Sequence, residues 1–446
     1  MSIVIAFAVF LAAMLFCLVR DFSLAWALLL ALILFFCMGL KRGYKAKELA
    51  KMAWSKMPKS MIVLRILAYI GILTGLWRSC GTIAFFIYYG IRAITPSLFI
   101  LVAFLLTVLL SYALGTSFGV TSTAGIVLMA LARSGGVNPA VAAGAILSGV
   151  YFGDRGAPTS SCASLVAALT ETDLLGNVKR MFKTAAIPYA LCLVIYTLLS
   201  FRNPITTVDE TMLSALKESF DISFWTVIPA VIMIVLPFLK VPIRKAMAIS
   251  AAVAFIITIA VQHIGVWEAL KICLLGYYPN EGMLASVVSG GGLISMKTPF
   301  LMIPLAALYT GILEGTGALD SMQEKLQKLS DRIGKLPTMN LLSIAAAMVL
   351  CNQTIVVMME HQIMGKVYAR EGAEHEEFAM DIANSGVTIA GLVPWCIACA
   401  VPLSMLDVGV ESLPYAPLLY LIPICYLFTK KHFFPQNLKK TEANDR

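Results

Sequence analysis

Long apolar runs alternate with short polar segments along almost the whole chain. A membrane-spanning helix needs about 20 mostly apolar residues, and runs of about that length or longer recur from residue 3 to residue 429. The candidate spans cover residues 3–20, 22–40, 60–77, 96–133, 138–172, 183–200, 223–239, 244–262, 283–313, 339–369, 378–404 and 414–429. This pattern predicts an all-α polytopic membrane protein.

Four of these runs are too long or too polar for one straight helix. Gly, Pro, Ser and Thr interrupt residues 96–133, 138–172, 339–369 and 378–404. Unpaired backbone groups cannot face lipid, so a helix that breaks at membrane depth is buried in protein or lines a cavity. Broken helices at matching positions of two halves are the best sequence indication of a transporter site. We therefore expect the chemistry at these breaks.

The two halves of the chain share short motifs in the same order. The matched pairs are residues 71–75 with 311–315, Pro96 with Pro337, residues 148–150 with 385–387, and Pro158 with Pro394. Their offsets are 240, 241, 237 and 236 residues, which indicates an internal duplication. The predicted organisation is a first membrane repeat at 1–205, a polar linker at 206–222, a second membrane repeat at 223–430 and a basic tail at 431–446.

Composition excludes a soluble chain. Hydrophobic residues make up 59% and charged residues 13% of the sequence, whereas a soluble domain is about half apolar and about a quarter charged. The net charge of +9 comes from clusters beside the apolar runs, so we expect the lipid bilayer as a partner and no nucleic acid.

The distribution of charge among the loops predicts the topology. Lys and Arg gather at 41–59 and in the tail, as is typical of cytoplasmic segments. Because residues 3–20 and 22–40 read as a hairpin, both termini are expected in the cytoplasm of a multi-pass cell-membrane protein. The corresponding loop of the second half, 263–282, lacks this basic charge. Because only one of these two corresponding loops is basic, we predict that they lie on opposite sides of the membrane and that the two repeats are inverted.

Two breaks in the first half carry polar side chains. The first, at 115–123, combines glycines with hydroxyls, which suit a hard cation such as sodium, although small residues also serve helix packing. The second, at 153–161, contains an acidic and a basic residue directly after its first glycine. An ionised side chain at the centre of a membrane helix costs about 2.5–3.5 kcal/mol, so charges at this depth indicate a partner or a function. The alternative is that the segment is a loop at the membrane surface, where water solvates both charges. The candidates for ion or substrate binding are Thr116, Ser117, Thr121, Ser122, Asp154, Arg155, Thr159 and Ser160.

Different roles are open to the two charged residues. Asp154 can bind a cation or carry a proton. Arg155 can be its ion-pair partner or can bind an anionic substrate. Pro158 can begin a second half-helix, whose exposed N–H groups favour a carboxylate.

The second half offers a parallel set of candidates. Residues 352–354 fall where 115–117 fall in the first half. Glu360 is the most plausible titratable group there, unless it is an interfacial carboxylate near the acidic loop. The second-half candidates are Asn352, Gln353, Thr354, Glu360, Asp381, Asn384, Ser385 and Thr388, and the candidate sodium ligands of the whole chain are Thr116, Ser117, Asp154 and Asn352.

No signature of a soluble enzyme is present. The sequence has no P-loop and no HExxH motif. The GxSxG spacing at 115–119 lies inside a long apolar run and not on the strand-to-helix turn of a nucleophile elbow. Its ten cysteines lie mostly inside apolar runs, where a small core residue is the simplest interpretation. The run Ser289-Gly290-Gly291-Gly292 predicts close helix packing or another break. We expect no enzyme activity and no cofactor, only Na+ and/or H+ as coupling ions.

At its breaks the sequence resembles the NhaC family of sodium/proton antiporters. The segments that carry the likeness are residues 115–119 with 125–126, residues 148–155, and residues 384–388 with 392–395. The likeness covers most of the chain, and Gly153-Asp154-Arg155 is its most specific part. It implies a scaffold domain paired with a transport domain that contains re-entrant hairpins. It also implies a homodimer with elevator-like motion.

The sequence departs from the family pattern at two places. Members often have Ser-Pro-Leu-Ser-Asp after the Gly-Asp motif, whereas this chain has Ala-Pro-Thr-Ser-Ser at 157–161. Members often have Thr-Gly-Asp-Gln in the second half, whereas residues 351–354 are Cys-Asn-Gln-Thr. Two acidic groups are therefore absent, which favours a relative that couples sodium or protons to an organic acid or amino acid.

Two functions follow from these observations. The first is a secondary transporter that exchanges sodium for protons. The alternative is a Na+- or H+-coupled transporter or exchanger of a small carboxylate or amino acid, which Arg155 and the half-helix N-termini favour. A membrane-embedded enzyme would need a catalytic pair that the sequence lacks, and a channel explains buried charges and duplicated breaks less well than alternating access does.

Overall fold

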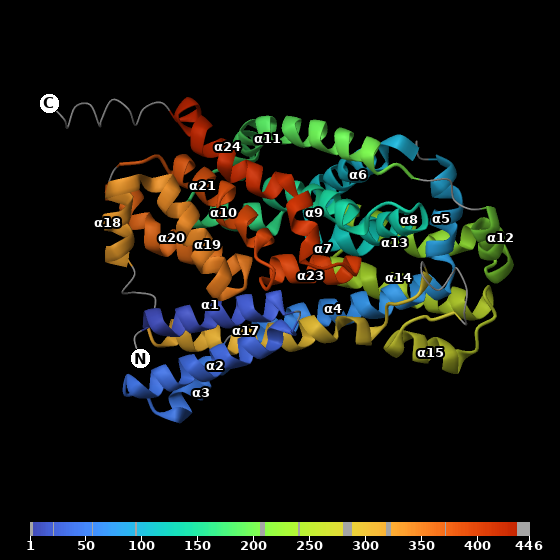
Figure 1. Cartoon of the computed structure of the whole chain (residues 1–446), viewed down its shortest axis with the longest axis horizontal. Helices are drawn as coiled ribbons and strands as arrows, with labels where there is room; N and C mark the ends of the chain where they lie inside the picture. Colours follow the sequence, from blue (N-terminus) through green and yellow to red (C-terminus); the bar gives the residue numbers. More distant parts are fainter. Residues whose placement is uncertain are drawn as a thin grey trace.

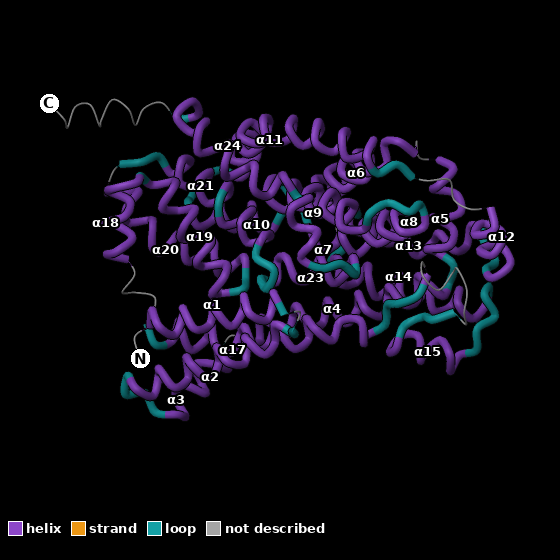
Figure 2. Tube along the Cα trace, viewed as in Figure 1, coloured by secondary structure: helices purple, strands orange, loops and turns teal. Residues whose placement is uncertain are grey.

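The computed structural model describes residues 3–20, 22–55, 57–93, 96–205, 210–239, 241–279, 288–317, 323–370 and 372–434. Helices make up most of this part of the chain, as Figure 2 shows, and it contains no β-strand beyond one isolated antiparallel bridge between Tyr277 and Gly290. The all-α prediction is confirmed. Residues 206–209 of the predicted linker and 435–446 of the tail lie outside the described residues.

The first half holds the following helices. They are α1 (Ile3–Val19), α2 (Leu24–Lys41), α3 (Ala46–Trp54), α4 (Met57–Ser79), α5 (Thr82–Ala93), η1 (Pro96–Leu98), α6 (Phe99–Leu114), α7 (Ser117–Val120), the π-helical turn η2 (Thr121–Gly125), α8 (Ile126–Ser134), α9 (Pro139–Gly156), α10 (Ser161–Leu169) and α11 (Leu174–Arg202).

The helices that follow belong to the polar segment and the second half. They are α12 (Glu210–Ser219), η3 (Phe224–Val227), α13 (Ile228–Phe238), α14 (Ile243–Ala260), α15 (Val266–Leu275), η4 (Leu293–Met296), α17 (Lys297–Gly315), α18 (Gln323–Ile333), α19 (Lys335–Leu350), α20 (Gln353–Arg370), α21 (His375–Asn384), α22 (Gly386–Ile389), η6 (Ala390–Leu392), α23 (Ile397–Leu406), η7 (Val410–Tyr415) and α24 (Pro417–Phe433).

The helices form two layers along the long axis of the molecule. Figure 1 shows α1–α4, α15 and α17 in the first layer, and α6–α11 with α19–α24 in the second. Between them, α14 packs on α4 while α13 contacts both α14 and α6. One end of the long axis holds α3 and α18, and we call it the α18 end. The other holds α5, α12 and α15, and we call it the α12 end.

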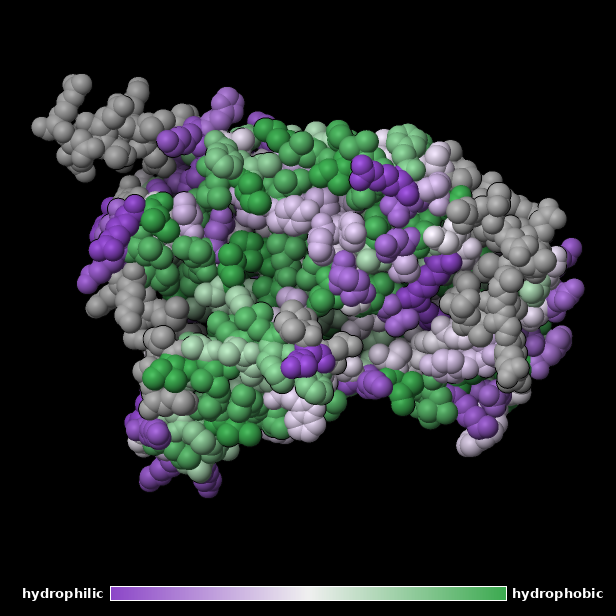
Figure 3. Space-filling view, viewed as in Figure 1, coloured by the Kyte–Doolittle hydropathy of each residue, from purple (hydrophilic) through white to green (hydrophobic). Residues whose placement is uncertain are grey.

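Several helices are able to span a membrane. By length and composition, four of the described helices can cross on their own, and two bent pairs raise the number to six if each pair is one span. Figure 3 shows hydrophobic side chains over much of the molecular surface, with hydrophilic side chains at both ends of the long axis and in a further group between them. The large hydrophobic share of the surface matches a polytopic membrane protein.

Two helical hairpins enter the second layer from opposite ends. α6 runs inward from the α12 end, and α19 runs inward from the α18 end (Figure 1). Each stops at a residue in the left-handed conformation, Gly115 with φ 68° and Cys351 with φ 53°. The chain then turns back, so that α8 contacts α5 and α20 contacts α18. The long runs 96–133 and 339–369 are thus two re-entrant hairpins with facing tips.

Two interrupted helices cross between these hairpins. α9 stops at Gly156 and the chain continues as α10, while the α21–α22 segment and α23 form a pair bent by 48°. Where they meet, the Tyr151 hydroxyl donates to the Ala398 carbonyl at 2.6 Å. A Cβ on Gly391 would lie 2.7 Å from the Tyr151 ring. The helix breaks at 157–160 and 393–396, which fall within the interrupted runs 138–172 and 378–404, therefore lie beside each other in the interior.

Glycine pairs allow backbone segments to pack directly on α4 and α17. A Cβ on Gly71 would lie 2.8 Å from the Gly292 carbonyl oxygen, and one on Gly311 would lie 2.4 Å from the Met52 carbonyl oxygen. Gly71 and Gly311 are 240 residues apart, and so are the residues that they contact, Met52 and Gly292. The glycine run before η4 thus serves close packing, as predicted. The shared contacts support internal duplication, while the boundaries of the repeats stay a prediction.

Candidate functional site

Each hairpin tip packs on the interrupted helix of its own half. A Cβ on Gly115 would lie 2.3 Å from Thr159 Oγ1 and 2.6 Å from the Ser160 backbone nitrogen, so only glycine fits this left-handed position. In the second half, the Ile397 N–H donates to the Cys351 carbonyl at 2.8 Å. The tips are thereby held at the breaks, in the middle of the second layer.

The caps at the two tips give the register of the repeat. Thr116 Oγ1 accepts a hydrogen bond from the Gly119 N–H at 3.3 Å, and Asn352 Oδ1 accepts one from the Ile355 N–H at 3.3 Å. Thr116 and Asn352 are 236 residues apart, and so are Gly119 and Ile355. The sequence alignment of 352–354 with 115–117 was therefore one residue out of register. Thr116 and Asn352 use their side chains as helix caps.

Asp154 lies between the two hairpin tips. Ser117 lies close enough to act on its side chain through both its backbone N–H and its hydroxyl, and Gln353 Nε2 lies 3.4 Å from its Oδ2. Ser117 and Gln353 begin α7 and α20 and are equivalent in the 236-residue register. Gln353 also donates to the Val387 carbonyl at 2.8 Å. Asp154 thus joins both hairpins, and its residue is only 7% exposed.

Arg155 turns away from its acidic neighbour, because successive residues on a helix point in different directions. Its guanidinium donates to the Met181 carbonyl at 3.1 Å, to Thr184 Oγ1 at 2.8 Å and to Asn384 Oδ1. In the part of the chain that the structure describes, no ion pair joins Arg155 to Asp154. The ion-pair interpretation is therefore wrong, and among the described residues the Asp154 carboxylate has the Gln353 contact but no cationic side chain beside it.

Glu360 is a second carboxylate in the interior. It is 0% exposed, which excludes the interfacial interpretation. Ser343 Oγ donates to its Oε1, while its Oε2 is buried without a hydrogen-bond partner. A Cβ on Gly386 would lie 2.3 Å from that oxygen, so the carboxylate rests on the α22 backbone. Cys162, in the first turn of α10, lies near both Asp154 and Glu360.

Asp381 belongs to a different environment. Lys430 Nζ, the Tyr368 hydroxyl and, at 3.0 Å, the Tyr426 hydroxyl all contact its carboxylate. Lys430 also lies 2.7 Å from the buried Glu377. The candidate Asp381 is therefore already neutralised by a lysine, in a buried ion-pair network among α20, α21 and α24.

The remaining candidates fall into two groups. Buried hydroxyls donate to backbone carbonyls of their own segments, and they belong to Thr121, Ser122, Ser160, Ser385 and Thr388. Ser160 also caps α10. The side chains of Thr159 and Thr354 are exposed and have no such role. Of the four candidate sodium ligands, the structure brings Ser117 and Asp154 together.

Helix ends of both signs meet around Asp154. The carbonyl ends of α6 and α9 and the N–H ends of α7 and α20 lie at the tips and breaks. Carbonyl ends favour cations and N–H ends favour anions, so the same small volume suits a carboxylate and a hard cation. The described residues contain no group of three His, Cys, Asp or Glu side chains gathered around one point, which leaves hydroxyl, amide and carbonyl oxygens beside Asp154.

Sequence reasoning missed several partners. Ser343 and Cys162 lie near the carboxylates, and the Val387 carbonyl fixes Gln353. No local signal marks them, because each lies in an apolar run and reaches the site only through folding.

Known proteins resemble this chain along most of its length. The family model described as the Na+/H+ antiporter family matches residues 149–429. A malate-2H+/Na+-lactate antiporter of Bacillus subtilis is 28% identical, over 96% of this chain and 94% of its own length. The Na+/H+ antiporter NhaC of Alkalihalophilus pseudofirmus is 24% identical over 84% of each chain. An arginine/ornithine antiporter of Halobacterium salinarum is 27% identical, over 84% of this chain and 79% of its own.

Proposed function

The chain belongs to the Na+/H+ antiporter family, and from this membership we propose that it exchanges sodium for protons at Asp154. The observation that carries the proposal is a buried carboxylate that both hairpins contact and that pairs with no cationic side chain of the described ranges. Family membership makes the protein a multi-pass secondary antiporter and not an enzyme.

The two ions compete for one carboxylate. An ionised Asp in this interior costs about 2.5–3.5 kcal/mol on insertion scales, and either a proton or a sodium ion removes that charge. Sodium takes additional oxygens from Ser117 and nearby backbone carbonyls, whereas a proton needs none. Binding of one ion therefore displaces the other, which is the condition for exchange.

The hairpins make the site accessible in turn from each side. Ser117 and Gln353 contact Asp154 from hairpins that enter from opposite ends of the molecule. A change that separates one tip from Asp154 opens a path from one end only. We propose that this happens within an elevator-like movement of the second layer against the first, in a homodimer.

The orientation in the membrane follows from the charges. The 41–59 loop contains α3, which lies at the α18 end, and α15 lies at the α12 end (Figure 1). We propose that the α18 end faces the cytoplasm of a cell membrane, because basic loops stay on that side. The chain then begins and ends in the cytoplasm.

The test is ion exchange in proteoliposomes. An imposed sodium gradient should move protons in the absence of any organic substrate, and the flux should fall steeply at acid pH as protons occupy the carboxylate. The proposal fails if sodium moves no protons over the whole accessible pH range.

The second candidate function is exchange of an organic anion or amino acid coupled to sodium or protons. It is favoured by the near full-length similarity to the malate-2H+/Na+-lactate antiporter and by the absence of the two family acids at 157–161 and 351–354. It replaces the first candidate if sodium moves protons only after malate, lactate or an amino acid is added.

A further inference from the structure

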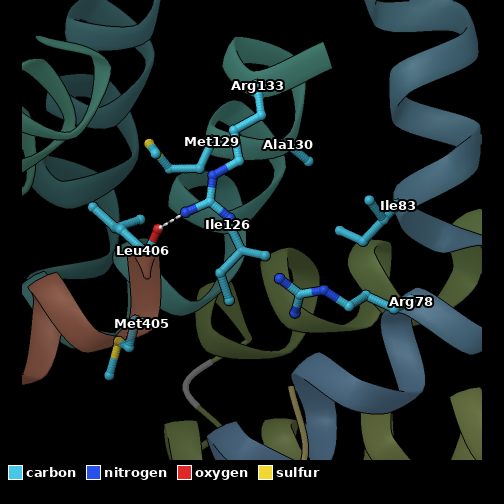
Figure 4. A pocket seen from close by; sticks show the side chains of 8 residues that line it. All are labelled: Arg78, Ile83, Ile126, Met129, Ala130, Arg133, Met405 and Leu406. Atoms are coloured by element: carbon cyan, nitrogen blue, oxygen red, sulfur yellow. Dashed lines mark hydrogen bonds between the residues drawn. The ribbon is translucent and has the colours of Figure 1, made fainter. Parts of the chain in front are cut away.

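An apolar groove lies on the surface of the first layer, between α2, α3 and α17. Its volume is about 350 Å³, within the range of about 300–1,000 Å³ that is usual for ligand sites. The pocket between Arg78 and Arg133 in Figure 4 is far smaller, since about 10 Å³ has room for one water molecule. The helices that form the groove contribute Ile33, Phe36, Ala50, Trp54 and Leu308 to its lining.

The groove is open to the surroundings of the protein. The Trp54 side chain is 65% exposed and the Ile33 side chain is 52% exposed. Tryptophan is enriched where the hydrocarbon of a bilayer meets the lipid headgroups, and α3 lies at the α18 end of the molecule (Figure 1). The groove therefore lies where a lipid can reach it from the membrane interface.

Two lysines share one face of α3 with residues that line the groove. Lys47, Ala50, Lys51 and Trp54 follow the spacing i, i+3, i+4 and i+7, which places them along one side of a helix. Both lysines are exposed. Leu49, on the opposite side of α3, is buried. Two positive charges thus stand beside an apolar channel, on a helix that its other side holds in place.

The charge around the groove selects its occupant. Residues 41–59 contain seven basic residues and one acidic residue, Glu48, and the Glu48 carboxylate accepts a hydrogen bond from the Lys45 N–H at 3.0 Å. A two-fold contact with a second copy of the chain would place this basic segment against itself, and facing like charges disfavour association. Clusters of four to eight basic residues beside a membrane helix are typical of sites for anionic lipids.

We propose that the groove binds one anionic phospholipid from the leaflet at the α18 end. An acyl chain occupies the apolar channel, and the headgroup phosphate lies at Lys47 and Lys51, since lysine binds phosphate as a point charge. The Trp54 ring lies between the two parts of the lipid, as its position on α3 requires. The site belongs to the first layer and is separate from Asp154, so the inference does not depend on sodium/proton exchange.

The test measures lipid binding to the purified full-length protein by native mass spectrometry. Phosphatidylglycerol and phosphatidylcholine with identical oleoyl chains are titrated separately, and the unaltered protein should bind the anionic lipid at least tenfold more tightly. Lys47→Gln/Lys51→Gln should weaken phosphatidylglycerol binding roughly twentyfold, because each basic residue near a membrane surface is worth about fivefold in affinity. The matched control is Lys179→Gln/Lys183→Gln, an exposed i, i+4 pair on α11, which should bind as the unaltered protein does.

A second variant tests the acyl-chain channel without changing charge. Ala50→Phe adds a large ring at an exposed position in the groove, so it should fold and should weaken phosphatidylglycerol binding at least tenfold. Equal binding of the two lipids, equal losses in the two double-lysine variants, or unaltered binding by Ala50→Phe would each overturn the inference. So would loss of a dimer in Ala50→Phe together with no lipid binding by the unaltered protein, because the groove would then hold a second copy.

Discussion

Replacing Asp154 by Asn tests the proposed ion site most directly. The substitution removes one charge but keeps the shape of the side chain, and the Asn oxygen can still accept hydrogen bonds from Ser117 and Gln353. The side chain at position 154 then no longer ionises. Because an ionised Asp costs about 2.5–3.5 kcal/mol in the bilayer interior, Asp154→Asn should be at least as stable as the unaltered protein.

The expected loss of cation binding is large. Two opposite unit charges 4 Å apart attract by about 4 kcal/mol at an effective dielectric constant of 20. That energy corresponds to a roughly thousandfold weaker affinity for sodium. Proton binding at this position disappears altogether, because an amide does not titrate. Asp154→Asn should therefore abolish sodium-driven proton flux while leaving expression and folding intact.

The assay records internal pH in proteoliposomes after a sodium gradient is imposed. Asp331→Asn is a suitable control, because that carboxylate is 46% exposed in a surface pair with Arg370, and such pairs contribute little. The control should retain full flux. Flux by Asp154→Asn within about twofold of the unaltered protein would remove Asp154 from the site and refute the reasoning.

Three further predictions follow from the packing and the charges. Gly115→Ala should lower the free energy of unfolding by about 1–3 kcal/mol, and with it the thermal unfolding midpoint. The added methyl group would sit on a residue with left-handed backbone and would clash with Thr159 and Ser160. Gly265→Ala, with open space around it, is the control, and equal stability of the two variants would contradict the tip packing. Glu360→Gln should fold but reduce sodium-driven proton flux at least tenfold, because its buried carboxylate also has no cationic partner in the part of the chain that the structure describes. Unaltered flux would exclude a role for it in coupling. Single cysteines on a Cys-free background should be labelled from the cytoplasm at 41–59 and from outside at 263–282, and labelling of both from one side would refute the inverted topology.

The sequence predicted the hairpins and breaks for a reason that applies to any membrane chain. Glycine and hydroxyl residues break the helix inside long apolar runs, and the unpaired backbone groups at such a break cannot face lipid. The breaks within 96–133 and 339–369 therefore had to be buried in the protein. The same reasoning predicted Asp154 as a site residue, because an isolated acid at such a turn is costly. It also predicted Glu360, and the structure buries that carboxylate completely.

The sequence alone determined that the chain is helical, crosses a membrane and carries polar breaks in both halves, since run length and local polarity decide these properties. Only the tertiary structure decided which charges meet. It turned Arg155 toward Asn384, gave Asp381 a lysine and placed Gln353 beside Asp154. Gln353 and Asp154 are 199 residues apart and Arg155 and Asn384 are 229 apart. Such pairs depend on how distant helices pack and on the direction of each side chain about its helix, and neither is encoded in a local pattern.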